Sequence, residues 1–175
     1  LDLVGNPGGN VEYAEDIAGY LCYDKQNFSN NSNLLVTTLK SRTGTLATYS
    51  TPSVYANYFD VNAEEPQIVV LTDGMSASAS ELLLGAVLDY GTAVHVGTTT
   101  YGKGIAQTIM PLEYYETLRF GDGSTMRYPY GIYFTAAMFY TPKNVNKHGA
   151  GFTPSEENRI SDVADMVERA AELLE

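Results

Sequence analysis

The chain has 175 residues, of which 44% are hydrophobic, and it carries a formal net charge of −11 at pH 7. This length and apolar fraction are enough to bury a core, so we expect one folded domain over residues 1–175 and not a disordered chain. The acidic balance, with a pI near 4.5, argues against nucleic-acid partners, because no basic patch is present to neutralise phosphates.

The first part of the chain predicts a helix followed by a β-hairpin. Helical spacing of apolar residues begins after Asn10, a suitable N-cap, and extends to Cys22. Cys22 is the one cysteine and cannot form an internal disulfide, so we expect a buried thiol. Residues 27–33 predict a polar loop, and strands over 34–39 and 45–49 are expected to pair as a hairpin.

The middle of the chain predicts a strand–helix–strand unit. The apolar run over 68–71 is typical of a buried strand, and apolar residues recur at helical spacing over 79–90. Strands are predicted at 93–96 and 105–112, on either side of a glycine-rich turn. Such a unit would bring the turn before the helix and the turn between these strands to the same edge of a sheet.

The last part of the chain predicts a tight turn at 121–124, a strand over 132–140 and an amphipathic helix starting near Ser161. We find no internal repeat, no metal-ligand spacing and no convincing phosphate-binding glycine loop, so we expect neither a metal nor a cofactor. The chain begins without a methionine, a signal peptide or a long apolar run, which suggests a fragment of a longer protein.

Three serines, Ser76, Ser78 and Ser80, lie at the predicted strand-to-helix turn. At a helix start, unpaired N–H groups and the helix dipole would stabilise an oxyanion forming beside Ser78. Serines at this position are more often helix caps, so the motif alone does not identify a nucleophile. Of the neighbouring acids, Glu81 is placed to cap the helix or stabilise its positive end, and we expect no proton transfer through Asp73 or Glu81.

Lys103 lies between Gly102 and Gly104, where a sharp turn is expected. A lysine acts as a general base only when its amine is neutral, which burial favours. No acidic residue lies within four positions of Lys103 in the sequence, which is compatible with a desolvated amine. A solvated turn lysine is the simpler alternative for this residue taken by itself.

Taken together, four blocks resemble the carboxyl-terminal processing peptidases, also called tail-specific proteases, which are serine endopeptidases with a Ser/Lys dyad. The blocks cover residues 1–9, 76–81, 101–107 and 140–154. The first is similar to the family's D-L-R-x-N-x-G-G segment and the third to its F-G-K-G-x-x-Q. Val4 replaces the usual arginine of the first block, and Tyr101 replaces a phenylalanine but keeps the ring.

The resemblance implies that Ser78 is the nucleophile, that Lys103 is its base and that the carboxamide oxygen of Gln107 orients the lysine amine. The backbone N–H groups of Gly9 and Ala79 would form the oxyanion hole. The implied fold is α/β, with a crotonase/Clp-protease-like ββα core, strand–helix–strand units and a C-terminal helix.

The same resemblance implies protein or peptide substrates cut near their C-termini, an upstream PDZ domain in the full-length chain, and an extracytoplasmic location. It leaves self-association open. Two alternatives also stay open: a catalytically silent peptide-binding or scaffold domain of the same fold, and a Ser/His hydrolase. The second is disfavoured, because His95 lies in an apolar strand pattern and His148 in a polar loop, and because residues 74–78 lack the last glycine of G-x-S-x-G.

Overall fold

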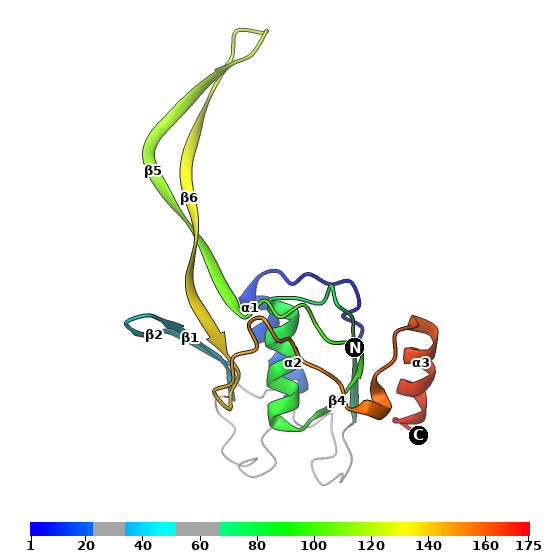
Figure 1. Cartoon of the computed structure of the whole chain (residues 1–175). Coiled ribbons are helices and arrows are strands. Elements are labelled where there is room, and N and C mark those ends of the chain that lie inside the picture. The colour runs from blue at the N-terminus through cyan, green and yellow to red at the C-terminus, as the bar shows by residue number, and fades with distance from the viewer. Residues whose placement is uncertain (23–33, 52–66) are drawn as a thin grey trace.

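The computed structural model describes residues 1–22, 34–51 and 67–175, so the polar loop predicted at 27–33 lies outside the described residues. Figure 1 shows a compact body of helices and strands from which one long hairpin projects. The elements in chain order are α1 (Val11–Leu21), β1 (Leu34–Ser41), β2 (Gly44–Thr51), β3 (Ile68–Thr72), α2 (Ala79–Tyr90), β4 (Ala93–Gly97), β5 (Ile105–Arg119), β6 (Thr125–Tyr140), the 3-10 helix η3 (Glu156–Asn158) and α3 (Val163–Glu172).

The predicted strand–helix–strand unit is confirmed as β3–α2–β4, in which β3 and β4 pair in parallel. All five residues of β3 are buried, because both faces of this short sheet are covered. Ile68 and Val70 face the main core with α2, whereas Val69 and Leu71 pack in a smaller cluster with Met166 of α3. This two-sided burial explains why the strand reads as an uninterrupted apolar run.

The second sheet is antiparallel, with strand order β2–β1–β6–β5. The hairpin predicted between β1 and β2 is confirmed. The strand after the lysine turn, β5, belongs to this second sheet and not beside β4, because it pairs with its own hairpin partner β6. Both strands are also longer than predicted, since β5 continues to Arg119 and β6 begins at Thr125, and their outer residues are exposed.

Helix α2 lies between the two sheets (Figure 1), and it is buried along most of its length. Gly85 in its interior costs about 1 kcal/mol of helix propensity relative to alanine. The packing explains it, because a Cβ at Gly85 would lie 2.7 Å from Thr141 Cγ2 and 2.8 Å from Phe152 Cζ. The helix therefore makes a close approach to the segment that follows β6.

The two outer helices have side-chain caps. Asn10 accepts a hydrogen bond from the Glu12 amide at 2.9 Å, as predicted for α1. At the other end of α1, Cys22 is buried, and burial raises its pKa to about 12. Helix α3 starts slightly later than predicted, because the Asp162 side chain caps its first turn. None of the helices in the described ranges is long and apolar enough to cross a bilayer.

Candidate active site

The turn between β3 and α2 holds Ser78 in an unusual backbone conformation. Ser78 has φ 59° and ψ −116°, a region that costs a non-glycine residue on the order of 1–3 kcal/mol. The adjoining residues are tied to the start of the chain, since the Ala77 amide and the Ser80 hydroxyl both donate to the Asn6 carbonyl, at 3.0 and 3.1 Å. Strain of this kind persists only where the surroundings fix it, and it is typical of functional sites.

The glycine loop of the first block lies directly against this turn. A Cβ at Gly8, which has φ +92°, would lie 2.5 Å from the Ala77 carbonyl oxygen and 2.7 Å from the Ala79 nitrogen. A Cβ at Gly9 would meet nothing within 4 Å. Within the described part of the chain, the amides of Gly9 and Ala79 donate to no protein acceptor. Both N–H groups are thus available to an oxyanion.

Glu81, in the first turn of α2, joins the serine turn to the lysine turn. Its side chain is 1% exposed. One carboxylate oxygen accepts from the amides of Ser78 and Lys103, at 3.0 and 2.7 Å. The other accepts from the Gly102 amide at 2.7 Å and the Thr100 hydroxyl at 2.6 Å. The predicted capping role is confirmed by the bond from the Ser78 amide, whereas the bonds to the lysine turn are not predictable from local sequence.

Residues 146–151 of the fourth block lie directly against the lysine turn. A Cβ at Gly102 would lie 2.9 Å from the Gly151 nitrogen, and one at Gly104 would lie 2.7 Å from the His148 nitrogen. Asn146 donates from its side chain to the Gly104 carbonyl at 2.9 Å. The glycines on either side of Lys103 are therefore required by this close backbone approach.

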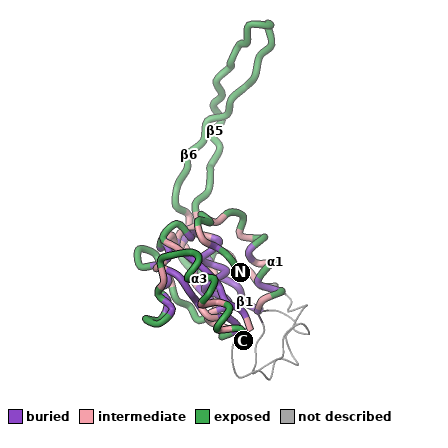
Figure 2. The backbone as a smooth tube through the Cα atoms, turned by 90° about the vertical axis from the view of Figure 1, so that its right-hand side faces the viewer, coloured by how far each residue is buried: buried purple, intermediate pink, exposed green. Residues whose placement is uncertain are grey.

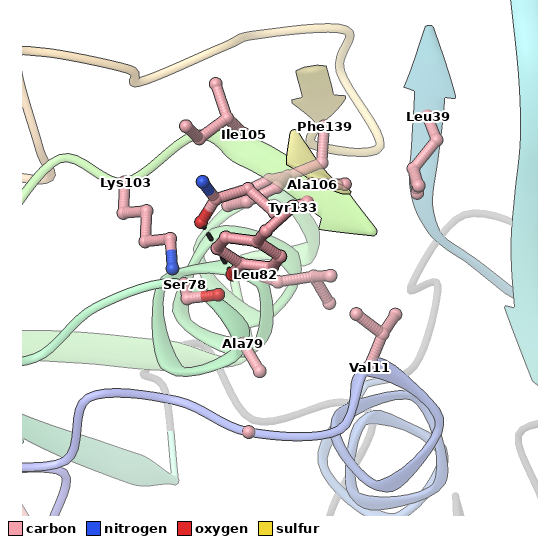
Figure 3. A pocket seen from close by; sticks show the side chains of 12 residues that line it. Val11, Leu39, Ser78, Ala79, Leu82, Lys103, Ile105, Ala106, Tyr133 and Phe139 are labelled. Carbon is pink, nitrogen blue, oxygen red and sulfur yellow. Dashed lines mark hydrogen bonds between the residues drawn. The ribbon is translucent and has the colours of Figure 1, made fainter. Parts of the chain in front are cut away.

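Ser78 and Lys103 line one pocket, and Figure 3 shows the lysine side chain extending toward Ser78. Both residues are half-buried. The pocket has a volume of about 200 Å³. It is lined by Gly9, Val11, Leu39, Ser78, Ala79, Leu82, Lys103, Ile105, Ala106, Gln107, Tyr133 and Phe139. Within the described ranges, no acidic side chain pairs with the lysine amine.

Gln107 also lines the pocket, but its carboxamide oxygen accepts a hydrogen bond from the Tyr133 hydroxyl at 2.9 Å (dashed line in Figure 3). The described residues show no hydrogen bond between Gln107 and Lys103. Tyr133 is a site residue that the sequence analysis missed. The position of Tyr133 relative to Gln107 depends on the register between β5 and β6, which cannot be predicted from the local sequence pattern.

Neither histidine lines this pocket. His95 is buried on β4, where its Nε2 lies 2.6 Å from the Thr72 hydroxyl, and burial lowers its pKa to about 4. His148 Nδ1 lies 3.2 Å from the Gly102 carbonyl oxygen. These positions fit the expectation that His95 is a strand histidine, and they give neither ring a contact with Ser78 among the described residues.

The side chain of Asp73 accepts hydrogen bonds from the residues that lead into the serine turn and from the first block. It accepts hydrogen bonds from the amides of Gly5, Met75 and Ser76 and from the Ser76 hydroxyl. Desolvation raises the pKa of Asp73, but these hydrogen bonds outweigh it and hold the pKa below its ordinary value. Val4, which replaces the family's arginine, packs against the apolar cluster beneath α3.

The sequence profile of peptidase family S41 matches residues 1–157. The chain belongs to this family. Among curated S41 relatives, a carboxy-terminal-processing protease of Bartonella bacilliformis is 32% identical over 88% of this chain. A carboxyl-terminal-processing protease of Synechocystis is 31% identical over 89% of it. The chain spans 29% and 30% of the length of these two relatives.

Solved structures show the same fold. The photosystem II D1 C-terminal processing protease superimposes with a TM-score of 0.61 at 23% identity, covering 100% of this chain and 38% of that protein. An S41 protease structure from Bacteroides fragilis gives a TM-score of 0.60 at 17% identity, covering 99% of this chain and 42% of that protein. The predicted α/β fold class is thereby confirmed as that of S41 proteases.

Proposed function

We propose that this chain is the catalytic core of a serine endopeptidase, with Ser78 as nucleophile and Lys103 as general base. The observation that carries the proposal is the shared pocket, in which the lysine extends toward a serine held in a strained turn. Membership of peptidase family S41 supports it independently. The amides of Gly9 and Ala79, unpaired in the described structure, supply the oxyanion hole of the proposed site.

In the proposed mechanism, the neutral amine of Lys103 takes the hydroxyl proton of Ser78 as the oxygen attacks a peptide carbonyl. The Gly9 and Ala79 amides stabilise the oxyanion that forms. The charged lysine then protonates the leaving amine, and an acyl-enzyme remains. Water repeats the cycle on this ester and restores the serine. Ser/Lys pairs are a known variant of the catalytic triad.

We further propose that the substrates are unstructured or tail-exposed protein chains cut near their C-termini. The names of the relatives, carboxy-terminal-processing proteases, support this substrate class. An upstream PDZ domain, an extracytoplasmic location and self-association of the full-length protein remain proposals from the family resemblance. Nucleic acid is not a proposed partner, given the net charge of −11.

The test compares Ser78→Ala, Lys103→Ala and His148→Ala with the unsubstituted chain, using an unfolded protein substrate and a fluorophosphonate probe. We expect Ser78→Ala to abolish both cleavage and labelling, and Lys103→Ala to slow both by at least about a thousandfold, because it removes the base. His148→Ala should keep more than about a tenth of the activity.

Each alternative function predicts a different result. A catalytically silent peptide-binding domain would bind the unfolded protein with the Ser78→Ala and unsubstituted chains alike, without cleavage or labelling. A Ser/His hydrolase would lose activity in His148→Ala as fully as in Ser78→Ala and retain it in Lys103→Ala. Either pattern would overturn the Ser/Lys proposal.

A further inference from the structure

Tyr133 lies on β6 near the base of the long hairpin and donates a hydrogen bond to Gln107. We infer that Tyr133 is a positioning residue, which fixes the Gln107 carboxamide so that its oxygen is presented to the amine of Lys103. The inference rests on the proposed Ser/Lys site. It concerns how that site is kept in order and adds no group to the chemical steps themselves.

The contact is specific. The Tyr133 hydroxyl donates to Gln107 Oε1 at 2.9 Å, and both side chains line the pocket that contains Ser78 and Lys103. Gln107 lies in an exposed part of β5, and the described structure gives its side chain no hydrogen bond other than that to Tyr133. An exposed carboxamide without this bond would rotate freely.

An irregularity in strand pairing is what brings the two side chains together. Ala106 pairs with Ala137, but Gln107 pairs with Thr135, so β6 contains one extra residue at this point. With the shifted register, Tyr133 is the diagonal neighbour of Gln107 on the same face of the ribbon. Without the shift, Gln107 would pair with Ala136, and Tyr133 would point to the opposite face. Bulges that re-aim a side chain are common beside active sites.

The chemistry of the carboxamide explains why a tyrosine would matter. The two ends of the Gln107 amide differ, since the oxygen accepts hydrogen bonds and the NH2 group donates them. The lysine amine has N–H donors and needs an acceptor, so the NH2 end would oppose it. A carbonyl oxygen has two lone pairs and can accept from Tyr133 and Lys103 together. The Tyr133 donor therefore selects the productive end.

Two other titratable side chains near the lysine turn, those of Glu81 and His148, interact with groups other than Gln107. The carboxylate of Glu81 already accepts four hydrogen bonds, two of them from the lysine turn. His148 Nδ1 lies 3.2 Å from the Gly102 carbonyl oxygen. Neither side chain hydrogen-bonds to Gln107 in the described structure.

The test is a double-mutant cycle with Tyr133→Phe, Gln107→Ala and both together, measuring kcat and KM on an unfolded protein substrate. Phenylalanine keeps the ring in the pocket and removes only the hydroxyl. We expect Tyr133→Phe to lower kcat about tenfold with KM within twofold, and to have little further effect in the Gln107→Ala background. Tyr130→Phe is the matched control, because Tyr130 also donates to a side chain of β5, Glu116, but lies outside the pocket. It should stay within twofold of the unsubstituted chain.

A second measurement does not depend on cleavage. In ¹⁵N NMR spectra, the side-chain NH2 signals of Gln107, assigned by their loss in Gln107→Ala, should move toward the values of a freely rotating glutamine in Tyr133→Phe and stay unchanged in Tyr130→Phe. Unchanged signals in Tyr133→Phe, or an equal loss of kcat in both backgrounds, would overturn the inference. If Ser78→Ala and the unsubstituted chain proved equally inactive, the proposed function would fail, while the NMR signals would still decide whether Tyr133 orders Gln107.

Discussion

At the scale of single residues, Glu81 connects the two turns that carry the proposed dyad. An ionised carboxylate only accepts hydrogen bonds and has about four acceptor positions. In this structure four donors occupy them, from Ser78, Thr100, Gly102 and Lys103. The bonds from the Thr100 hydroxyl and the Gly102 amide are buried, so without Glu81 these two donors would lack water as well as an acceptor. Glu81 thus fixes the distance between the serine and lysine backbones.

Substituting Glu81→Gln should therefore reduce both stability and activity. The amide NH2 would face donors where an oxygen now accepts, so we expect the free energy of unfolding to fall by about 2–4 kcal/mol. Urea unfolding and fluorophosphonate labelling of Ser78 measure the two effects. Glu168→Gln, at an exposed position on α3, is the control and should change stability by less than about 0.5 kcal/mol. Stability and labelling equal to the unsubstituted chain would show that Glu81 does not hold the turns.

At the scale of elements, the parallel pair β3–β4 places the two turns together. Ser78 follows the last residue of β3 by six positions (78 − 72), and Lys103 follows the last residue of β4 by six (103 − 97). Since the carboxyl ends of neighbouring parallel strands share an edge, both turns open on the same side. The glycine loop before α1 then completes the pocket through its contact at Gly8.

The contact at Gly8 predicts a difference between two glycine substitutions. Gly5 and Gly8 both have positive φ, at +69° and +92°, but only a Cβ at Gly8 would meet other atoms. Each alanine should cost on the order of 1–2 kcal/mol of backbone strain. Gly8→Ala should in addition push the loop off the serine turn and slow fluorophosphonate labelling at least about tenfold. Labelling of Gly5→Ala within about threefold serves as the control for strain alone, and equal rates for the two variants would contradict the expectation.

At the scale of the whole molecule, the β5–β6 hairpin projects far beyond the body (Figures 1 and 2). Every residue from 107 to 135 is exposed. The buried core includes Ala137 and Phe139 at the inner end of β6. The outer ribbon therefore contributes little apolar burial to the stability of the body.

Shortening the hairpin tests whether the outer ribbon contributes to the stability of the body. Replacing residues 112–130 with an Asn-Gly turn keeps the paired ends Pro111 and Gly131 and supplies residues suited to a two-residue hairpin. We expect the free energy of unfolding by urea to change by less than about 1 kcal/mol, and labelling of Ser78 to persist, because Gln107 and Tyr133 are retained. A shortened chain that failed to fold would show that the outer ribbon supports the body.

The sequence by itself determined the elements of the body, because their signals are local. The apolar run of β3, the helical spacing of α2 and the cap at Asn10 each report burial or hydrogen bonding within a few residues. The strand–helix–strand pattern also predicted that Ser78 and Lys103 lie at one edge of a sheet.

Only the tertiary structure decided which groups complete the site. The bonds of Glu81 to the lysine turn join residues about 20 positions apart, and Tyr133 reaches Gln107 through a one-residue shift in strand register. The sheet that receives β5 and the apolar packing of Val4 were decided in the same way. The physical reason is that periodicity records how each residue meets its chain neighbours and its solvent, whereas register and through-space contacts depend on how separate elements fit together.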